Sequence, residues 1–170
     1  KIIMEIGAGY GHLTNEILLK EVKKISAIEK DKKLVSFLQK KFKNYDNIKI
    51  VNQDILNIIE ENNLEKNVIV FGNLPYNIST KILASFITLK EWPPWYDILI
   101  FMFQKEVADR IIATAHSKEF GRLSILANWR LEIKKHFNIS KNCFFPKPKI
   151  NSTVLSFMPK KINTFKLKNP

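Results

Sequence analysis

Short apolar runs alternate along the chain with segments in which apolar side chains recur every three or four residues. The runs have the length and β-branched content of buried strands, and the spaced segments match one face of an amphipathic helix. The pattern predicts strands over residues 2–6, 24–29, 48–51, 68–71, 97–103, 133–139 and 152–157. It predicts helices with apolar faces at 13–18, 34–42 and 78–86, a short helix over 55–60 and a further one over 121–129.

The order of these elements predicts an α/β fold. Up to residue 103, strands and helices alternate, which favours parallel strands joined by helical crossovers on both faces of one sheet. The strands at 133–139 and 152–157 are separated only by a loop too short for a helical crossover, so they should pair antiparallel. We therefore expect a mostly parallel seven-stranded sheet with an antiparallel last strand.

A glycine-rich segment follows the first predicted strand and reads Glu5-Ile-Gly-Ala-Gly-Tyr-Gly11. Glycines at positions 7, 9 and 11 permit a tight turn and let a ligand approach the backbone closely. A dinucleotide-binding fingerprint would have its third glycine at position 12, where the chain has His12, and no lysine follows as in a P-loop. The segment therefore disfavours a nicotinamide oxidoreductase and a phosphate cradle.

Two carboxylates stand at the ends of the next two predicted strands, and in open α/β sheets ligands bind at the carboxyl ends of strands. Glu29 can accept hydrogen bonds from two ribose hydroxyls, and Asp54 can accept from an adenine amino group. Glu5 can engage an ammonium group. A ligand with ribose, adenine and ammonium but no phosphate is S-adenosylmethionine. The alternative for each carboxylate is a helix N-cap or a solvated surface.

The fourth predicted strand ends in the tetrapeptide Asn73-Leu74-Pro75-Tyr76. The side-chain oxygen of Asn73 and the carbonyl of Leu74 can accept from the exocyclic amine of a base, and Pro75 restricts the backbone of the turn. Tyr76 can stack on the base. The alternative interpretation is a proline-containing surface loop with a buried tyrosine.

These segments resemble the ribosomal RNA adenine N6,N6-dimethyltransferase family of the KsgA type. The likeness extends over residues 1–158, and the segments that carry it are 5–11, 27–29, 53–54, 71–80, 103–107, 121–124, and 144–149 with Ser152. The resemblance implies a Rossmann-like, class I S-adenosylmethionine-dependent methyltransferase. It further implies transfer of two methyl groups to each of two adjacent adenosines near the 3′ end of small-subunit rRNA, and a role in small-subunit biogenesis.

The resemblance also implies which residues act. It implies cofactor contacts at Gly7, Glu29, Asp54 and Asn73, and from the glycine-rich segment itself we also expect contacts at Glu5 and Gly9. Base handling is expected from Asn73, Leu74, Pro75 and Tyr76, with Phe144 stacking on the base. The expected partner is small-subunit rRNA or its precursor particle. Because the family has a segment before the glycine strand and a small helical C-terminal domain, we expect residues 1–158 to be a trimmed catalytic core and 159–170 to be a basic linker.

Charge and cysteine content add to this picture. Lys and Arg total 28 against 16 Asp and Glu, so the formal charge is +12, which favours a polyanionic partner. The single cysteine, Cys143, excludes an intramolecular disulfide; a reducing, cytoplasmic location and a buried thiol are expected. The three histidines show no metal-ligand spacing, and no apolar stretch approaches membrane-spanning length. We expect a monomer without a metal or a membrane contact.

Two alternatives stay open. A resistance methyltransferase acting on large-subunit rRNA has a similar asparagine–proline–tyrosine turn, although residues 121–124 and the Phe144 loop favour the small-subunit type. A non-catalytic RNA-binding assembly or transcription factor could use the same fold, but it would not need Glu29, Asp54 and Asn73 together.

Overall fold

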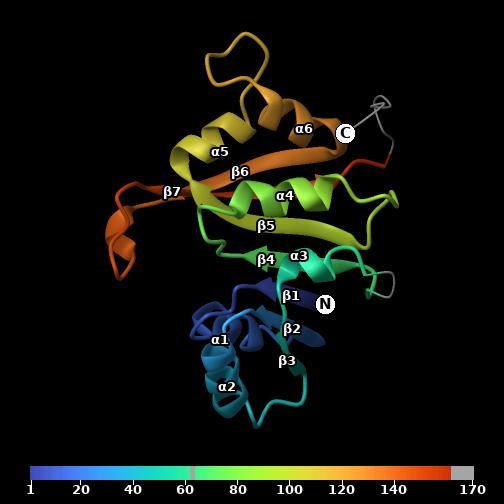
Figure 1. Cartoon of the computed structure of the whole chain (residues 1–170), viewed down its shortest axis with the longest axis vertical. Helices are drawn as coiled ribbons and strands as arrows, with labels where there is room; N and C mark the ends of the chain where they lie inside the picture. The colour runs from blue at the N-terminus through green and yellow to red at the C-terminus, as the bar shows by residue number, and fades with distance from the viewer. Residues whose placement is uncertain (62–63, 162–170) are drawn as a thin grey trace.

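The computed structural model describes residues 1–61 and 64–161, which form one seven-stranded sheet with the order β3-β2-β1-β4-β5-β7-β6 (Figure 1). Its strands are β1 (Ile2–Ile6), β2 (Lys24–Glu29), β3 (Ile48–Asn52), β4 (Val68–Gly72), β5 (Tyr96–Gln104), β6 (Leu131–Ile139) and β7 (Ser152–Pro159). Its helices are α1 (His12–Leu18), α2 (Lys32–Lys41), α3 (Ile55–Ile58), α4 (Ser79–Ile87), α5 (Lys105–Ile111) and α6 (Arg122–Arg130), with a 3₁₀ turn at Lys141–Cys143.

The strand directions confirm the expected sheet. β1 lies between β2 and β4 and pairs parallel with both, while β2 pairs parallel with β3 and β4 with β5. β7 lies between β5 and β6 and is antiparallel to each. Because Ile6 is level with Ile28 on one side and with Gly72 on the other, β1, β2 and β4 end at one edge of the sheet. The loops that follow these strands are therefore neighbours.

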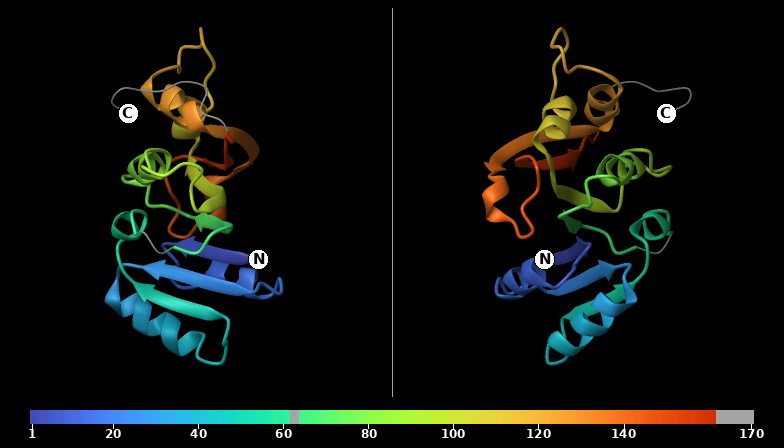
Figure 2. Two further views of the ribbon diagram at one scale, coloured as in Figure 1. Left: turned by 90° about the vertical axis from the view of Figure 1, so that its right-hand side faces the viewer. Right: turned by 60° about the vertical axis from the view of Figure 1, so that its left-hand side comes forward.

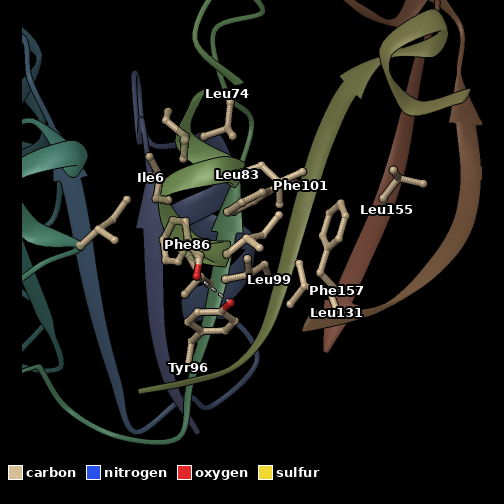
Figure 3. Packing of buried hydrophobic residues seen from close by; sticks show 14 of the residues in the cluster. Ile6, Leu74, Leu83, Phe86, Tyr96, Leu99, Phe101, Leu131, Leu155 and Phe157 are labelled. Atoms are coloured by element: carbon tan, nitrogen blue, oxygen red, sulfur yellow. Dashed lines mark hydrogen bonds between the residues drawn. The ribbon is translucent and has the colours of Figure 1, made fainter. Parts of the chain in front are cut away.

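Alternation of side chains along the strands divides the core into two layers. On β1, Ile3 belongs to the layer under α1 and α2, whereas Met4 and Ile6 belong to the layer under α3, α4 and α6. Figure 2 shows α3 and α4 along one side of the sheet. The second layer is rich in aromatic rings: the ring centres of Phe86 on α4 and Phe101 on β5 are 5.8 Å apart (Figure 3). Burial on both faces explains why the strands are continuous apolar runs.

The boundaries differ from the predictions at several points. The predicted helix over 55–60 is a single turn, Ile55–Ile58, and α5 was not predicted. Cys143 is exposed, so the prediction of a buried thiol was wrong: it ends a 3₁₀ turn without buried residues, in the loop that projects from the sheet between β6 and β7 (Figure 1). β7 continues to Pro159, and most of the segment 159–170 expected as a linker lies outside the described residues.

Candidate active site at the carboxyl edge of the sheet

The glycine loop after β1 is held in a conformation that other residues rarely adopt. Gly7, Gly9 and Gly11 have φ angles of +70°, +56° and +70°. The backbone N–H of Gly7 donates to the carbonyl of Ile28 at 2.9 Å, which continues the pairing with β2 past the strand end. A β-carbon on Gly11 would lie 2.6 Å from the ring of Phe42. The loop therefore turns tightly between β1 and α1, as the glycine spacing predicts.

Glu29 faces this loop from the end of β2. One of its carboxylate oxygens accepts the backbone N–H of Gly9 at 2.9 Å, and the other accepts the N–H of Asp31 at 2.9 Å. Each carboxylate oxygen has a second lone pair for a further donor. The structure therefore brings Glu29 to the glycine loop, with acceptor capacity left for a ligand's hydroxyl groups.

Asp54 follows β3 and caps α3. Its carboxylate accepts the backbone N–H of Leu56 at 3.0 Å and the ammonium of Lys30 at 2.8 Å. The hydrogen bond from Lys30 is the main reason that the pKa of Asp54 is lowered from its ordinary value. Asp54 is thus a helix N-cap, which was the alternative to a ligand-binding role. It is also an ionised acceptor on the same edge as Glu29. Its contact with an adenine amino group stays a prediction.

Glu5 is buried within β1, with 2% of its surface exposed. The hydroxyl of Thr14, in the first turns of α1, donates to its carboxylate at 2.5 Å. Burial raises the pKa of Glu5 to about 7. Its carboxyl group is enclosed by the fold and bonded to α1, and its contact with a ligand ammonium stays a prediction.

The turn that follows β4 lies beside the glycine loop. A β-carbon placed on Gly7 would be 3.9 Å from the carbonyl oxygen of Asn73. Asn73 and Pro75 are exposed, whereas Leu74 is buried with 2% of its surface exposed and anchors the turn in the core. The carbonyl of Pro75 accepts the N–H of Ile78 at 3.1 Å, which leads the chain into α4. The turn therefore presents the Asn73 side chain to solvent next to the loop.

A hydrogen bond joins Tyr76 to the start of β7. The hydroxyl of Tyr76 lies 2.7 Å from that of Ser152, the first residue of β7. Phe144 is half-buried in the preceding loop, and its neighbour Phe145 is fully exposed. Figure 1 shows this loop at the end of the sheet where β4 and β5 terminate. The loop that carries Phe144 thus lies at the expected edge, and the stacking of Phe144 on a base stays a prediction.

The described residues contain no group of three or more histidine, cysteine, aspartate or glutamate side chains placed to hold a metal ion. No helix in that part of the chain is long and apolar enough to cross a membrane. One hollow of about 300 Å³ lies against β1, β2 and β3 and is lined by Gln53, just past the end of β3, among others. Another of about 560 Å³ lies along α5 and the segment that follows it.

Sequence and structure comparisons agree on the relatives of this chain. The family model for ribosomal RNA adenine dimethylase matches residues 1–169. The ribosomal RNA small subunit methyltransferase A of Pelagibacter ubique is 49% identical over the whole chain, which covers 64% of that relative. A dimethyladenosine transferase from Plasmodium falciparum superposes with a TM-score of 0.79 at 29% identity, over 94% of this chain and 56% of that one.

The 23S rRNA methyltransferase ErmE has the same fold, with a TM-score of 0.77 at 22% identity over 97% of this chain and 64% of that one. The likeness to both structures, together with the strand order, shows a Rossmann-like methyltransferase fold. The chain spans less than two thirds of the length of the curated relatives that it matches. The match of the family model and the identity to the Pelagibacter protein show that the chain belongs to the ribosomal RNA adenine dimethylase family.

Proposed function

We propose that the chain is the catalytic core of an enzyme that dimethylates the N6 amine of two adjacent adenosines near the 3′ end of small-subunit rRNA. The proposal rests on the closeness of the Asn73 turn to the glycine loop. The carbonyl oxygen of Asn73 would lie 3.9 Å from a β-carbon placed on Gly7. A methyl donor on the loop and an amine on the turn would then be neighbours. The relatives reported above, a ribosomal RNA small subunit methyltransferase A and a dimethyladenosine transferase, support this substrate.

The residues at the carboxyl edge fit S-adenosylmethionine as the methyl donor. Gly7 and Gly9 have positive φ angles and no side chains, so a ligand can approach the backbone there, and Glu29 keeps lone pairs for ribose hydroxyls. Asp54 and Asn73 would complete the contacts, with Glu5 near the ammonium group. When bound, the donor supplies a methyl group on a sulfonium, which an amine nitrogen accepts by displacement of the sulfur.

The turn after β4 would hold the adenine. Asn73 and the carbonyl of Leu74 accept hydrogen bonds from N6, which favours a nitrogen lone pair that points at the methyl group, and Pro75 keeps the two acceptors fixed. Tyr76 stacks on one face of the base and Phe144 on the other. Positioning and electrostatics then supply most of the rate enhancement. The attacking nitrogen loses one proton for each methyl group gained.

The assembly context follows from the same proposal. We propose residues 1–158, with Pro159 completing β7, as the catalytic core, and the basic stretch after it as a linker. The enzyme acts as a monomer on small-subunit rRNA or its precursor particle in the cytoplasm, without a metal. Its action contributes to the biogenesis of the small subunit.

The test is methylation of purified RNA by the full-length protein. Small subunits with unmethylated adenosines and large-subunit RNA are incubated side by side with labelled donor, and mass spectrometry locates the product. We expect N6,N6-dimethyladenosine at two adjacent positions of the small-subunit RNA. Label only in the large-subunit RNA would favour the resistance type, and no binding of the donor by calorimetry would favour the non-catalytic RNA-binding alternative.

The net charge of +12 predicts that rRNA binding depends strongly on salt. If four phosphates are neutralised, the affinity should fall about tenfold between roughly 100 and 200 mM salt, because bound counterions are released from the RNA. Titrations of full-length protein with a fluorescent rRNA fragment at four salt concentrations measure the slope. An affinity that does not change with salt would show that the excess positive charge does not contact the RNA.

A further inference from the structure

One hydrogen bond joins the base-binding turn to a strand 76 residues further along the chain. The hydroxyls of Tyr76 and Ser152 are 2.7 Å apart; Tyr76 is half-buried and Ser152 has no exposed surface. The hydroxyl oxygen lies on the axis of the second side-chain torsion, so a hydrogen bond there fixes the direction in which the ring points, which the first torsion sets, and thereby where the ring lies beside the turn. The plane of this ring is the surface on which a base would stack.

The backbone of Ser152 is held in place by its neighbours in the sheet. It is level with Gln104 at the end of β5 and with Ile139 at the end of β6, so strands flank it on both sides. The preceding residue, Asn151, accepts the N–H of Lys105 at its carbonyl at 2.9 Å. Its side-chain oxygen accepts the N–H of Lys141 at 3.0 Å, which closes the base of the Phe144 loop.

We infer that Ser152 is a positioning residue for base binding: its hydroxyl orients the ring of Tyr76 and ties the turn after β4 to the base of the loop that carries Phe144. The inference rests on the proposed function, because it concerns the ring that would stack on the target adenine. Ser152 itself touches no substrate. Removal of the Ser152 hydroxyl should leave binding of the donor and of RNA unchanged. It should lower the turnover number, since a misoriented base is bound but reacts slowly.

A double-mutant cycle in the full-length protein tests the inference, with kcat and KM measured on unmethylated small subunits. Tyr76→Phe and Ser152→Ala each remove one partner of the same hydrogen bond and should each lower kcat about threefold to tenfold. The double variant should be no slower than the slower single variant, because both changes remove one interaction. KM for the donor should stay within about twofold in all three.

Ser156→Ala is the matched control. Ser156 lies four residues along β7 on the same face of the strand, is also buried, and its hydroxyl is 2.8 Å from Nε2 of the exposed His136. This variant removes an equivalent hydroxyl away from the turn and should keep wild-type kcat. Circular dichroism melts establish that each variant is folded.

The outcomes distinguish a failure of the positioning role of Ser152 from a failure of the proposed function. Wild-type kcat in Tyr76→Phe or in folded Ser152→Ala, or losses that multiply in the double variant, would overturn the positioning role. If Ser152→Ala does not fold, the kcat of Tyr76→Phe decides alone. A wild-type enzyme that methylates no adenosine of small-subunit RNA would instead overturn the proposed function.

Discussion

Replacing Asn73 with alanine is expected to lower methyl transfer by about 10³-fold while the protein stays folded. The side chain is exposed, so its loss should change the free energy of unfolding by less than about 0.5 kcal/mol. Its oxygen is the acceptor proposed to orient the adenine N6 amine, a weak nucleophile whose lone pair is delocalised into the ring. Without it the amine is neither oriented nor stabilised as positive charge develops on nitrogen.

The control for this change is Asn77→Ala, in the same turn. Asn77 is also an exposed asparagine, but it lies past Tyr76 at the entry to α4. Transfer of labelled methyl groups to unmethylated small subunits, measured at saturating donor, compares the two variants of the full-length protein. Near wild-type transfer by Asn73→Ala would refute the role of the turn, and equal losses in both variants would show a general disturbance of the loop.

Much of the fold is predictable from the sequence because its strands are buried on both faces. Apolar runs located all seven strands to within about two residues, since the periodicity signal is strongest where every position is apolar. Helix α5 escaped prediction because only Ala108 and Ile111 of its seven residues are buried, too few to establish a helical period. The position of β7 between β5 and β6 depends on pairing across many residues, and no local pattern encodes it.

The candidate site was predictable in its location and less so in its contacts. Strand ends placed Glu29, Asp54 and Asn73 on one edge because parallel strands share their direction. The partners that hold site residues were not predicted: Lys30 on Asp54, Thr14 on Glu5 and Ser152 on Tyr76. These pairs are separated by 24, 9 and 76 residues, and they depend on how side chains point in the folded sheet. Sequence spacing alone carries no such information.

Glu5→Gln is expected to change how stability depends on pH. The pKa of Glu5 is raised by burial from 4.5 to about 7, so the folded protein holds this proton more tightly than the unfolded chain does. The stability that the protonated group contributes is complete below pH 4.5 and is lost as the pH rises to about 7, a loss of about 3 kcal/mol. Glutamine keeps the acceptor for Thr14 and does not titrate.

Urea unfolding at several pH values between roughly 4 and 8 measures this effect. The stability of wild type relative to Glu5→Gln should fall across that interval and level off above pH 7. Glu16→Gln, on the exposed side of α1, controls for the loss of a negative charge and should differ from wild type by less than about 0.5 kcal/mol. A constant difference between wild type and Glu5→Gln would show that Glu5 does not titrate in this range.

The same titration links stability to the proposed cofactor role of Glu5. An ammonium group near this carboxyl would favour its ionised form, so affinity for S-adenosylmethionine should rise as the pH rises toward 7, over the same interval in which the free protein loses stability. Calorimetry at pH 6 and pH 8 should show a rise in wild type and a weaker one in Glu5→Gln. The ionised carboxylate would then destabilise the free protein at neutral pH and would also bind the ammonium group of the donor. Equal pH dependence in the two proteins would remove Glu5 from the cofactor contacts and leave it a structural partner of Thr14.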